Sequence, residues 1–231
     1  MITLVLLPGL DGTGLLFANF ARFFGADVKI IVASYPTDVA LGYSELEPIA
    51  RSFLPKDQPF VLLGESFSGP IAISIAASRP PGLLGLVLCC SFMRSPRPSL
   101  AVLRPLLSVV PVASLPLALL SFFVLGRFSS PALRRSLVES LARVSPSVLR
   151  ARARAALSVD LSPVLSRVDV PVLYLRASED RVVPQSASQA IVALAPATKV
   201  VEFSAPHFLL QALPSQAATT VREFMECHRG F

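Results

Sequence analysis

The sequence predicts an α/β domain, with a mostly parallel β-sheet, helices on both faces of the sheet and one helical insertion. Short apolar runs alternate with longer stretches of helical periodicity along the 231 residues, as in parallel strands that are buried on both faces. The hydrophobic fraction of 53% is sufficient for a large core. The alternation is interrupted once, by a stretch rich in proline, leucine, serine and arginine. We therefore expect a core of residues 1–91 and 168–231, and a helical cap of residues 92–167.

Two patterns place the individual elements. Strands are expected where apolar runs are bounded by turn residues, near 2–7, 28–33, 59–63, 83–90, 171–175 and 198–203. Helices are expected where apolar residues recur at helical spacing, near 14–24, 43–54, 67–78, 185–194 and 207–226. Because strands and helices alternate, successive strands run parallel and helices cover both faces of the sheet. The loops after the strands then meet at one edge, where α/β sheets collect ligand-binding groups.

The first strand is followed by a glycine-rich loop, residues 8–14, with the sequence PGLDGTG. Glycines let backbone N–H groups approach a ligand closely and adopt positive φ angles, so the Leu10 N–H is a candidate donor to an anion. A phosphate-binding loop is disfavoured, because the Lys-Ser/Thr pair of a P-loop and the G-x-G-x-x-G spacing are both missing.

The third strand leads into the hexapeptide GESFSG, residues 64–69, and an apolar helix follows. A serine at such a joint lies on a tight turn that exposes its hydroxyl, which makes Ser66 a candidate nucleophile. The Phe67 N–H, at the start of the helix, is a candidate donor to an oxyanion. The pattern departs from G-x-S-x-G because Ser68 stands at the fifth position, so the hexapeptide alone could also be an ordinary tight turn.

A nucleophilic serine needs a base within hydrogen-bond reach and an acid that orients the base. His207 is the expected base because it follows the last strand, whereas His228 lies near the end of the sequence, where chains fray. Asp180 is the expected acid because it lies in the loop after the fifth strand. Glu179 is a weaker alternative, and Asp169 precedes the strand and belongs at the opposite edge of the sheet.

These motifs, taken together, resemble those of α/β-hydrolases of the esterase and lipase type over nearly the whole sequence. Residues 7–14 resemble the oxyanion loop, 64–69 the nucleophile elbow, 178–184 the acid loop and 206–208 the histidine loop. The order of serine, acid and histidine is also that of the family. Residues 7–14 are similar, in addition, to hydrolase-like domains of plastid phytyl ester synthases, which are acyltransferases. Against the family pattern, we expect a sheet shortened by its first hairpin.

The resemblance and the residues together predict hydrolysis of a carboxylic ester or thioester through an acyl-Ser66 intermediate. His207 is expected to be the base, Asp180 to orient it, and the N–H groups of Leu10 and Phe67 to bind the oxyanion. No metal or organic cofactor is implied. Two alternatives remain open at this point: an acyltransferase that uses the same triad, and a ligand-binding protein that keeps the triad without turnover.

The cap contains a charge-free run, residues 105–126, that is long enough to span a bilayer. Three prolines interrupt it, which disfavours a continuous spanning helix. We expect short apolar helices that line an acyl pocket, and therefore a lipophilic ester substrate. The candidate pocket residues are Leu106, Leu107, Leu117, Leu120, Phe122 and Phe123.

The net charge of +6 is concentrated in the cap, which has ten arginines and two acids between residues 92 and 160. The arginines of the segment 150–154 alternate with alanine, so they spread around a helix, and no aromatic platform accompanies them. Nucleic acid is therefore not an expected partner. A solvated helix face and peripheral contact with a membrane or lipid remain open.

Three cysteines include the adjacent pair Cys89 and Cys90 in an apolar strand. The pattern predicts buried free thiols and neither a disulfide framework nor a metal site. A reducing compartment follows, so we expect a cytoplasmic location, peripheral to a membrane if the cap binds lipid. No positively charged segment follows Met1, and a cleavable signal peptide is not expected.

Overall fold

A parallel sheet of six strands forms the centre of the computed structural model, which describes residues 2–56, 58–99 and 116–228. The strand order is β2-β1-β3-β4-β5-β6, and every pairing between these strands is parallel. All six predicted strands are present, with ends that differ by at most two residues from those expected. The strands are β1 (Ile2–Leu7), β2 (Val28–Val32), β3 (Phe60–Glu65), β4 (Leu83–Cys89), β5 (Val172–Ala177) and β6 (Lys199–Phe203).

The chain reverses its direction of travel across the sheet between β1 and β3, which are neighbours. Loops that leave the carboxyl ends of two such strands run to opposite sides and open a crevice between them, where α/β folds bind ligands. The loop after β1 is the glycine-rich segment 8–14, and the turn after β3 carries Ser66. The topology thus brings together two motifs that are more than fifty residues apart in the sequence.

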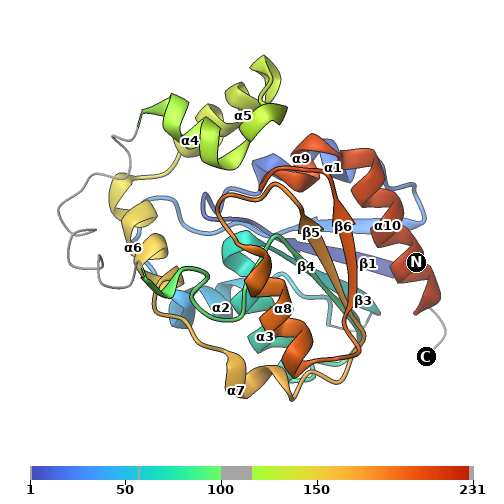
Figure 1. Ribbon diagram of the computed structural model, residues 1–231. Coiled ribbons are helices and arrows are strands. Elements are labelled where there is room, and N and C mark those ends of the chain that lie inside the picture. The colour runs from blue at the N-terminus through green and yellow to red at the C-terminus, as the bar shows by residue number, and fades with distance from the viewer. Residues whose placement is uncertain (1, 57, 100–115, 229–231) are drawn as a thin grey trace.

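Helices cover both faces of the sheet (Figure 1). On one face Phe20 of α1 and Val221 of α10 belong to the same buried apolar cluster as Leu4 of β1. On the other face Leu46 of α2 and Ile71 of α3 belong to a second apolar cluster. The helical elements of the core are η1 (Leu15–Phe17), α1 (Ala18–Ala21), α2 (Tyr43–Arg51), η2 (Ser66–Ser68), α3 (Gly69–Ala77), α8 (Gln185–Leu194), α9 (Leu209–Ala212) and α10 (Pro214–Cys227).

Two predicted helices differ from the structure. The expected helix over residues 207–226 is two helices, because Pro214 cannot donate a backbone hydrogen bond and disfavours helical geometry at the preceding Leu213. The expected helix over residues 14–24 is a 3₁₀ turn followed by the four-residue α1. After α1 the chain continues in turns, in which the N–H of Phe23 bonds to the carbonyl three residues earlier.

The insertion between β4 and β5 is helical, as predicted. Serines cap two of its helices, since Ser130 accepts a hydrogen bond from Leu133 N and Ser145 accepts one from Val148 N. Figure 1 shows α4, α5 and α6 outside the two helical layers, whereas Leu165 of α7 packs in the same apolar cluster as α3. The elements are α4 (Leu117–Val124), η6 (Gly126–Phe128), α5 (Pro131–Leu141), α6 (Pro146–Ala156) and α7 (Ser162–Leu165).

None of the helices in the described parts of the chain is long and apolar enough to cross a membrane. Of the charge-free run at 105–126, the first part lies outside the described residues and the rest forms α4 and the start of η6.

Candidate active site

Ser66 stands between β3 and α3 with a φ angle of 49°, in the left-handed region that few residues other than glycine adopt. The turn is tightly packed around it. A Cβ atom added to Gly64 would lie 2.8 Å from the Ala72 side chain and 2.9 Å from the Ser68 carbonyl oxygen, so only glycine fits there. A strained, crowded strand-to-helix turn is the geometry that lifts a serine hydroxyl above a parallel sheet. The predicted elbow is therefore present around Ser66.

Ser68, the departure from the G-x-S-x-G pattern, has an ordinary right-handed conformation with φ −83°, so a side chain is accommodated. Its hydroxyl is fully buried and donates a hydrogen bond to the Pro8 carbonyl. The Tyr35 hydroxyl lies 2.9 Å from Ser68 Oγ. Because the proton of the Ser68 hydroxyl is donated to Pro8, the Tyr35 hydroxyl donates and Ser68 Oγ accepts. The departure thus adds a polar link between the elbow and the glycine-rich loop.

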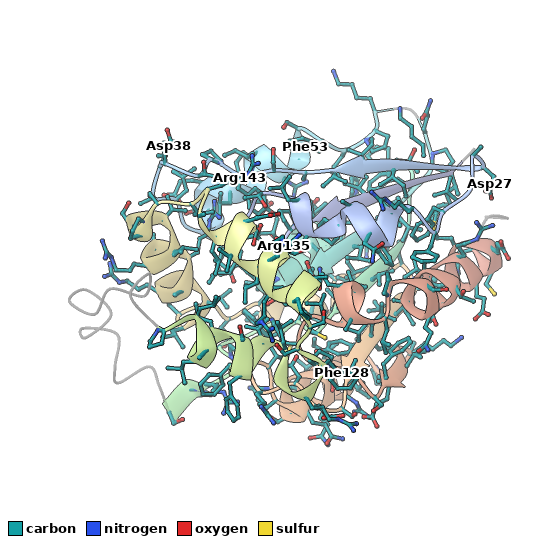
Figure 2. The ribbon with its side chains drawn as sticks, turned by 90° about the horizontal axis from the view of Figure 1, so that it is seen from above. Asp27, Asp38, Phe53, Phe128, Arg135 and Arg143 are labelled. Carbon is teal, nitrogen blue, oxygen red and sulfur yellow. The ribbon has the colours of Figure 1, made fainter. Side chains whose placement is uncertain are left out.

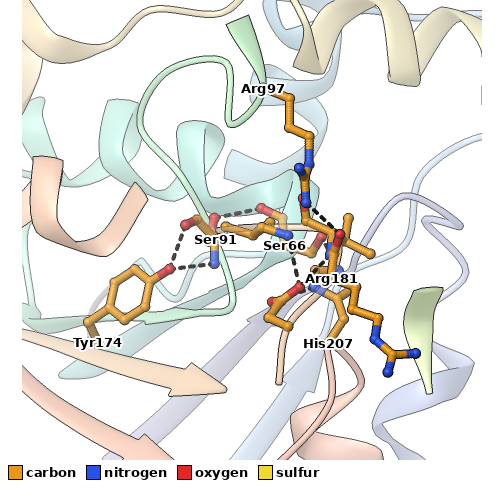
Figure 3. A network of polar contacts seen from close by, with 9 residues as sticks. Ser66, Ser91, Arg97, Tyr174, Arg181 and His207 are labelled. Atoms are coloured by element: carbon orange, nitrogen blue, oxygen red, sulfur yellow. Dashed lines mark hydrogen bonds and ion pairs between the residues drawn. The ribbon is translucent and has the colours of Figure 1, made fainter. Parts of the chain in front are cut away.

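The side chains of Ser66, His207 and Asp180 form a continuous hydrogen-bonded chain. The Ser66 Oγ lies 2.9 Å from His207 Nε2, and His207 Nδ1 lies 2.8 Å from Asp180 Oδ2. Since a carboxylate only accepts, Nδ1 carries the proton and Nε2 is left to accept from the Ser66 hydroxyl. Asp180 is fixed in turn, because its Oδ1 accepts the N–H groups of Val182 and Val183, each at 2.8 Å. Figure 3 shows this network around Ser66 and His207.

Two buried groups beside the serine have shifted pKa values. Burial alone would lower the pKa of His207, but the charge of Asp180, its hydrogen bond and the charge of Glu65 outweigh this effect and raise it. Glu65 directly precedes Ser66, and burial raises its pKa to about 7 against the hydrogen bond that Gln211 Nε2 donates to it at 2.9 Å. Neither Glu65 nor Gln211 is a candidate from the sequence alone.

The glycine-rich loop lies directly beside the nucleophile. A Cβ atom added to Gly9 would lie 4.0 Å from the Ser66 Cβ. All five carbonyl groups of residues 8–12 accept hydrogen bonds, from Ser68, Gly12 N, the Arg152 guanidinium (twice) and Tyr35 N. By contrast, the Leu10 N–H has no acceptor among the residues that the structure describes.

The Phe67 N–H is the second N–H group near Ser66. It lies in the first turn after the strand, where backbone donors have no partner within the helix. Two backbone donors are thus available next to Ser66, from the two loops that the sheet topology brings together. A pair of N–H groups at this position can bind the negative oxygen of a tetrahedral intermediate.

Ser91, two residues after the neighbouring strand β4, supports the elbow, a role that its local sequence does not indicate. Its Oγ donates to the Ser66 carbonyl at 2.6 Å, and its backbone exchanges two hydrogen bonds with the Tyr174 hydroxyl, at 3.1 and 2.6 Å (Figure 3). Ser91 also packs tightly against Gly69, because a Cβ atom added to Gly69 would lie 1.7 Å from Ser91 Oγ. The strained carbonyl of Ser66 is thus held by a fully buried side chain.

Other acids and the second histidine are engaged elsewhere. Glu179 forms a two-pronged ion pair with Arg127, at 2.8 and 2.5 Å. Asp169 pairs with Arg79, the second residue after the helix α3, at 2.9 Å. His228 Nδ1 donates to the carbonyl of Phe224 on its own helix at 2.7 Å. Asp180 is therefore the acid that contacts His207, as predicted, and Glu179 is not.

Two of the three cysteines, Cys89 and Cys90, are buried free thiols as predicted, whereas Cys227 is exposed, which corrects that part of the prediction. Cys90 has a φ angle of 47° and lies close to the ligand atoms of Asp180 and His207, all within 4.8 Å of one another. Three such atoms could approach a cation. However, burial raises the pKa of the Cys90 thiol well above its usual value, and His207 uses both ring nitrogens within the hydrogen-bonded chain. This donor set suits proton transfer better than metal binding.

A cavity of about 410 Å³ opens in the cap beside α4 and η6. Leu117 and Phe122, two of the predicted pocket residues, line it together with Ser121 and Arg134. Leu120 and Phe123 are not among its described lining, and Phe123 is exposed at the surface. Leu106 and Leu107 lie outside the described residues. The volume is within the range of pockets that bind small molecules.

Two arginines of the cap bind the acid loop, and one arginine of that loop binds the cap, which charge counting could not show. Arg97 Nη2 donates to the Arg181 carbonyl at 2.7 Å, and Arg127 pairs with Glu179, both in the acid loop. Arg181 in turn lies 4.1 Å from the centre of the Phe122 ring and donates to the Phe122 carbonyl at 2.9 Å.

Other cap arginines face outward. Arg135 and Arg143 are exposed on the cap, where Figure 2 labels them in the view from above. The basic character of the cap therefore divides into arginines that bind the core and arginines that face solvent.

Two known proteins are similar to parts of this chain. Mouse (Mus musculus) monoglyceride lipase is 29% identical over 161 residues, which is 66% of this chain and 51% of the lipase. Phytyl ester synthase 1 of Arabidopsis thaliana is 31% identical over 118 residues, which is 47% of this chain and 16% of the synthase. The chain thus spans about half the length of the first relative and much less of the second.

The fold is shared with solved structures as well. An esterase from Exiguobacterium antarcticum superposes with a TM-score of 0.82 at 15% identity, over 98% of this chain and 92% of the esterase. The family model for the alpha/beta hydrolase family matches residues 4–223. The chain therefore belongs to the alpha/beta hydrolase family.

Proposed function

We propose that the protein hydrolyses carboxylic esters of lipophilic acids through an acyl-Ser66 intermediate. The observation that carries the proposal is the hydrogen-bonded chain Ser66–His207–Asp180, placed beside the loop whose Leu10 N–H has no partner in the part of the chain that the structure describes. The base contacts both the nucleophile and the orienting acid, and the loop that carries the oxyanion donor lies beside the nucleophile.

Acylation begins when the Ser66 oxygen attacks the ester carbonyl carbon while His207 Nε2 takes the hydroxyl proton. The carbonyl oxygen becomes an oxyanion, which the N–H groups of Leu10 and Phe67 bind. The tetrahedral intermediate then collapses, the bond to the alcohol oxygen breaks, and the His207 imidazolium protonates that oxygen. Asp180 holds His207 in the required tautomer and stabilises the imidazolium.

Deacylation repeats these steps with water. His207 Nε2 accepts a proton from a water molecule, whose oxygen attacks the acyl carbonyl carbon of Ser66. A second tetrahedral intermediate forms in the same pair of N–H groups. When it collapses, the bond to Ser66 Oγ breaks, the serine recovers its proton from His207 and the carboxylic acid leaves.

The preference for lipophilic substrates rests on the cap and on the relatives. The cavity beside α4 has an apolar wall that includes Leu117 and Phe122, and the similar mouse protein is named a monoglyceride lipase. An acyl chain in this cavity would bury apolar surface, and each buried methylene contributes about 0.8 kcal/mol to binding.

The test is turnover of p-nitrophenyl esters from acetate to dodecanoate, and of a monoacylglycerol, by the purified protein and by Ser66→Ala. We expect the wild-type protein to release p-nitrophenol, with kcat/KM rising with chain length, and Ser66→Ala to show no turnover above buffer. His207→Gln and Asp180→Asn serve as further variants of the same chain. Equal activity of the wild-type protein and Ser66→Ala would eliminate Ser66 as the nucleophile.

Acyl transfer is the second candidate, because part of the chain is similar to a phytyl ester synthase. In this case an alcohol replaces water in the deacylation step, and the product is a new ester. Adding a long-chain alcohol to the same assay separates the two reactions, since a transferase forms the new ester at the expense of the free acid. Tight binding of acyl ligands without any turnover would instead indicate a binding protein that keeps the triad.

A further inference from the structure

We propose that Arg152, on the cap helix α6, is a positioning residue for the oxyanion site, so that the cap completes the active site of the core. The proposal rests on the ester hydrolysis proposed above and adds a residue to its machinery. Arg152 is the largest side chain in the described residues that is fully buried. Two of its hydrogen bonds go to the glycine-rich loop, residues 8–14, which carries the Leu10 N–H.

The Arg152 guanidinium reaches from the cap into the glycine-rich loop of the core. Its Nη1 donates to the carbonyls of Leu10 at 2.9 Å and Asp11 at 2.8 Å, and its Nη2 donates to the carbonyl of Pro36 at 2.8 Å. The contact leaves no room for a side chain at position 12, because a Cβ atom added to Gly12 would lie 2.3 Å from Arg152 Nη1. One side chain thus bridges the loop after β1 and the segment after β2.

The Leu10 N–H lies in the loop segment that these bonds hold in place. The N–H shares a planar trans peptide with the Gly9 carbonyl, which accepts from Gly12 N at 3.0 Å, so the two groups point in opposite directions. The next two carbonyls, of Leu10 and Asp11, are turned toward Arg152. Because the carbonyls of Gly9, Leu10 and Asp11 are all engaged in hydrogen bonds, the Leu10 N–H is the group of this loop that can bind an oxyanion near Ser66.

The chemistry of the contact favours a role beyond stability. Arg152 forms no ion pair within 4 Å in the described part of the chain, and its hydrogen bonds go to neutral carbonyls. Its Nε is buried with no partner among the described residues. Burial of such a cation is costly, and well-packed apolar side chains often serve stability equally well. The guanidinium is, however, the side chain that can hold several carbonyls in a fixed plane.

The proposal is tested with Arg152→Ala and Arg152→Lys, and Arg150→Ala is the control because it removes a positive charge from the same helix. Kinetics are measured with p-nitrophenyl butyrate, and the active sites are counted by complete reaction with a fluorophosphonate, so that only folded enzyme enters kcat. Affinity for a trifluoromethyl ketone, which forms a tetrahedral adduct with the serine, reports the oxyanion site directly.

For Arg152→Ala we expect kcat per site to fall about 100-fold with KM changed less than about threefold, because misplaced groups act on the transition state. The inhibition constant of the ketone should rise by the same factor as kcat/KM falls. Methylguanidine in the buffer should restore part of the activity of Arg152→Ala and none in Arg150→Ala. Arg152→Lys should be intermediate, since an ammonium group cannot hold the same three carbonyls in one plane.

The proposal fails if kcat per site in Arg152→Ala is within threefold of that in Arg150→Ala, or if only KM changes. If Arg152→Ala does not fold, Arg152→Lys decides, and a wild-type kcat per site in that variant overturns the proposal. Ser66→Ala keeps this failure separate from failure of the proposed function. An active Ser66→Ala refutes the function, whereas an inactive Ser66→Ala with a fully active Arg152→Ala refutes only the role of Arg152.

Discussion

The Ser68 hydroxyl donates a hydrogen bond to the carbonyl of Pro8, so the residue at which the elbow departs from G-x-S-x-G also fixes the start of the glycine-rich loop. Ser68→Ala leaves the buried Pro8 carbonyl without this hydrogen bond, so the position of Pro8 is less well fixed. We expect kcat to fall about tenfold, equivalent to roughly 1.4 kcal/mol of transition-state stabilisation, with little change in KM. Steady-state kinetics per active site measure this.

Tyr35→Phe is the matched control for Ser68→Ala, because it removes the Tyr35 hydroxyl and leaves the bond from Ser68 to Pro8 in place. We expect a smaller loss of kcat in this variant. If Tyr35→Phe lowers kcat as much as Ser68→Ala does, the link from Ser68 to Pro8 is not what matters.

Glu65 couples the pH dependence of activity to a buried carboxyl group. The charge of Glu65 raises the pKa of His207, and His207 must be neutral to act as a base. In Glu65→Gln the His207 pKa should therefore decrease, and the acidic limb of the pH profile of kcat/KM should move to lower pH. An acidic limb at unchanged or higher pH would contradict this coupling.

Stability should depend on Glu65 in the same pH range. The pKa of Glu65 is raised to about 7 in the folded protein, so the folded state binds the proton more tightly than the unfolded state does. The contribution of Glu65 to stability is full below its unfolded pKa and is lost as pH rises to about 7. Between pH 5 and 8, urea unfolding should show a loss roughly 2 to 3 kcal/mol larger in the wild-type protein than in Glu65→Gln. Equal losses in both proteins would exclude a raised pKa.

The ion pair between Arg127 and Glu179 should matter little for stability, although its geometry is bidentate. Arg127 is exposed and Glu179 is partly exposed, and water and salt screen such pairs. In Arg127→Ala we expect the melting temperature to change by less than about 2 °C, and in Glu179→Ala likewise. Differential scanning calorimetry of the two variants and the double variant measures the coupling. A large loss in the single variants would show that the cap depends on this exposed contact.

We expect the outer face of α4 to contact lipid. Leu119 and Phe123 on this helix are 41% and 44% exposed, and Arg134 and Arg135 are exposed on the neighbouring helix α5. Apolar side chains next to arginines favour an anionic membrane surface. The protein should co-sediment with vesicles that contain phosphatidylserine, less so at high salt, and Leu119→Ser with Phe123→Ser should weaken binding. Equal binding to purely zwitterionic vesicles would show that the arginines do not contribute to membrane binding.

The positions of the strands along the sequence, the elbow and the hydrogen-bonded chain were predictable because each depends on local patterns. Apolar runs mark the buried strands, and in a parallel sheet the loops after them must meet at one edge. Because Ser66, Asp180 and His207 all lie in such loops, the sequence predicted that they are close together. The break at Pro214 was also available in the sequence, since proline is found at the first turn of helices and disfavours helical geometry before it.

The supporting residues could not be predicted, because they act through contacts across space. Ser91 and Tyr174 join two strands to the elbow, and nothing in their local sequence indicates that contact. Arg152 did leave a signal. It follows the buried residues Val148 and Leu149 at helical spacing, so it lies on the apolar face of its helix, where a charged side chain needs specific partners.

The contact between Gly69 and Ser91 limits how this protein can be altered. A methyl group at position 69 would collide with the Ser91 side chain, while removal of that side chain would release the Ser66 carbonyl. Neither position can change alone at low cost, so the two should covary among homologues. Libraries for directed evolution should therefore randomise positions 69 and 91 together, since a library at either position alone samples mostly inactive sequences.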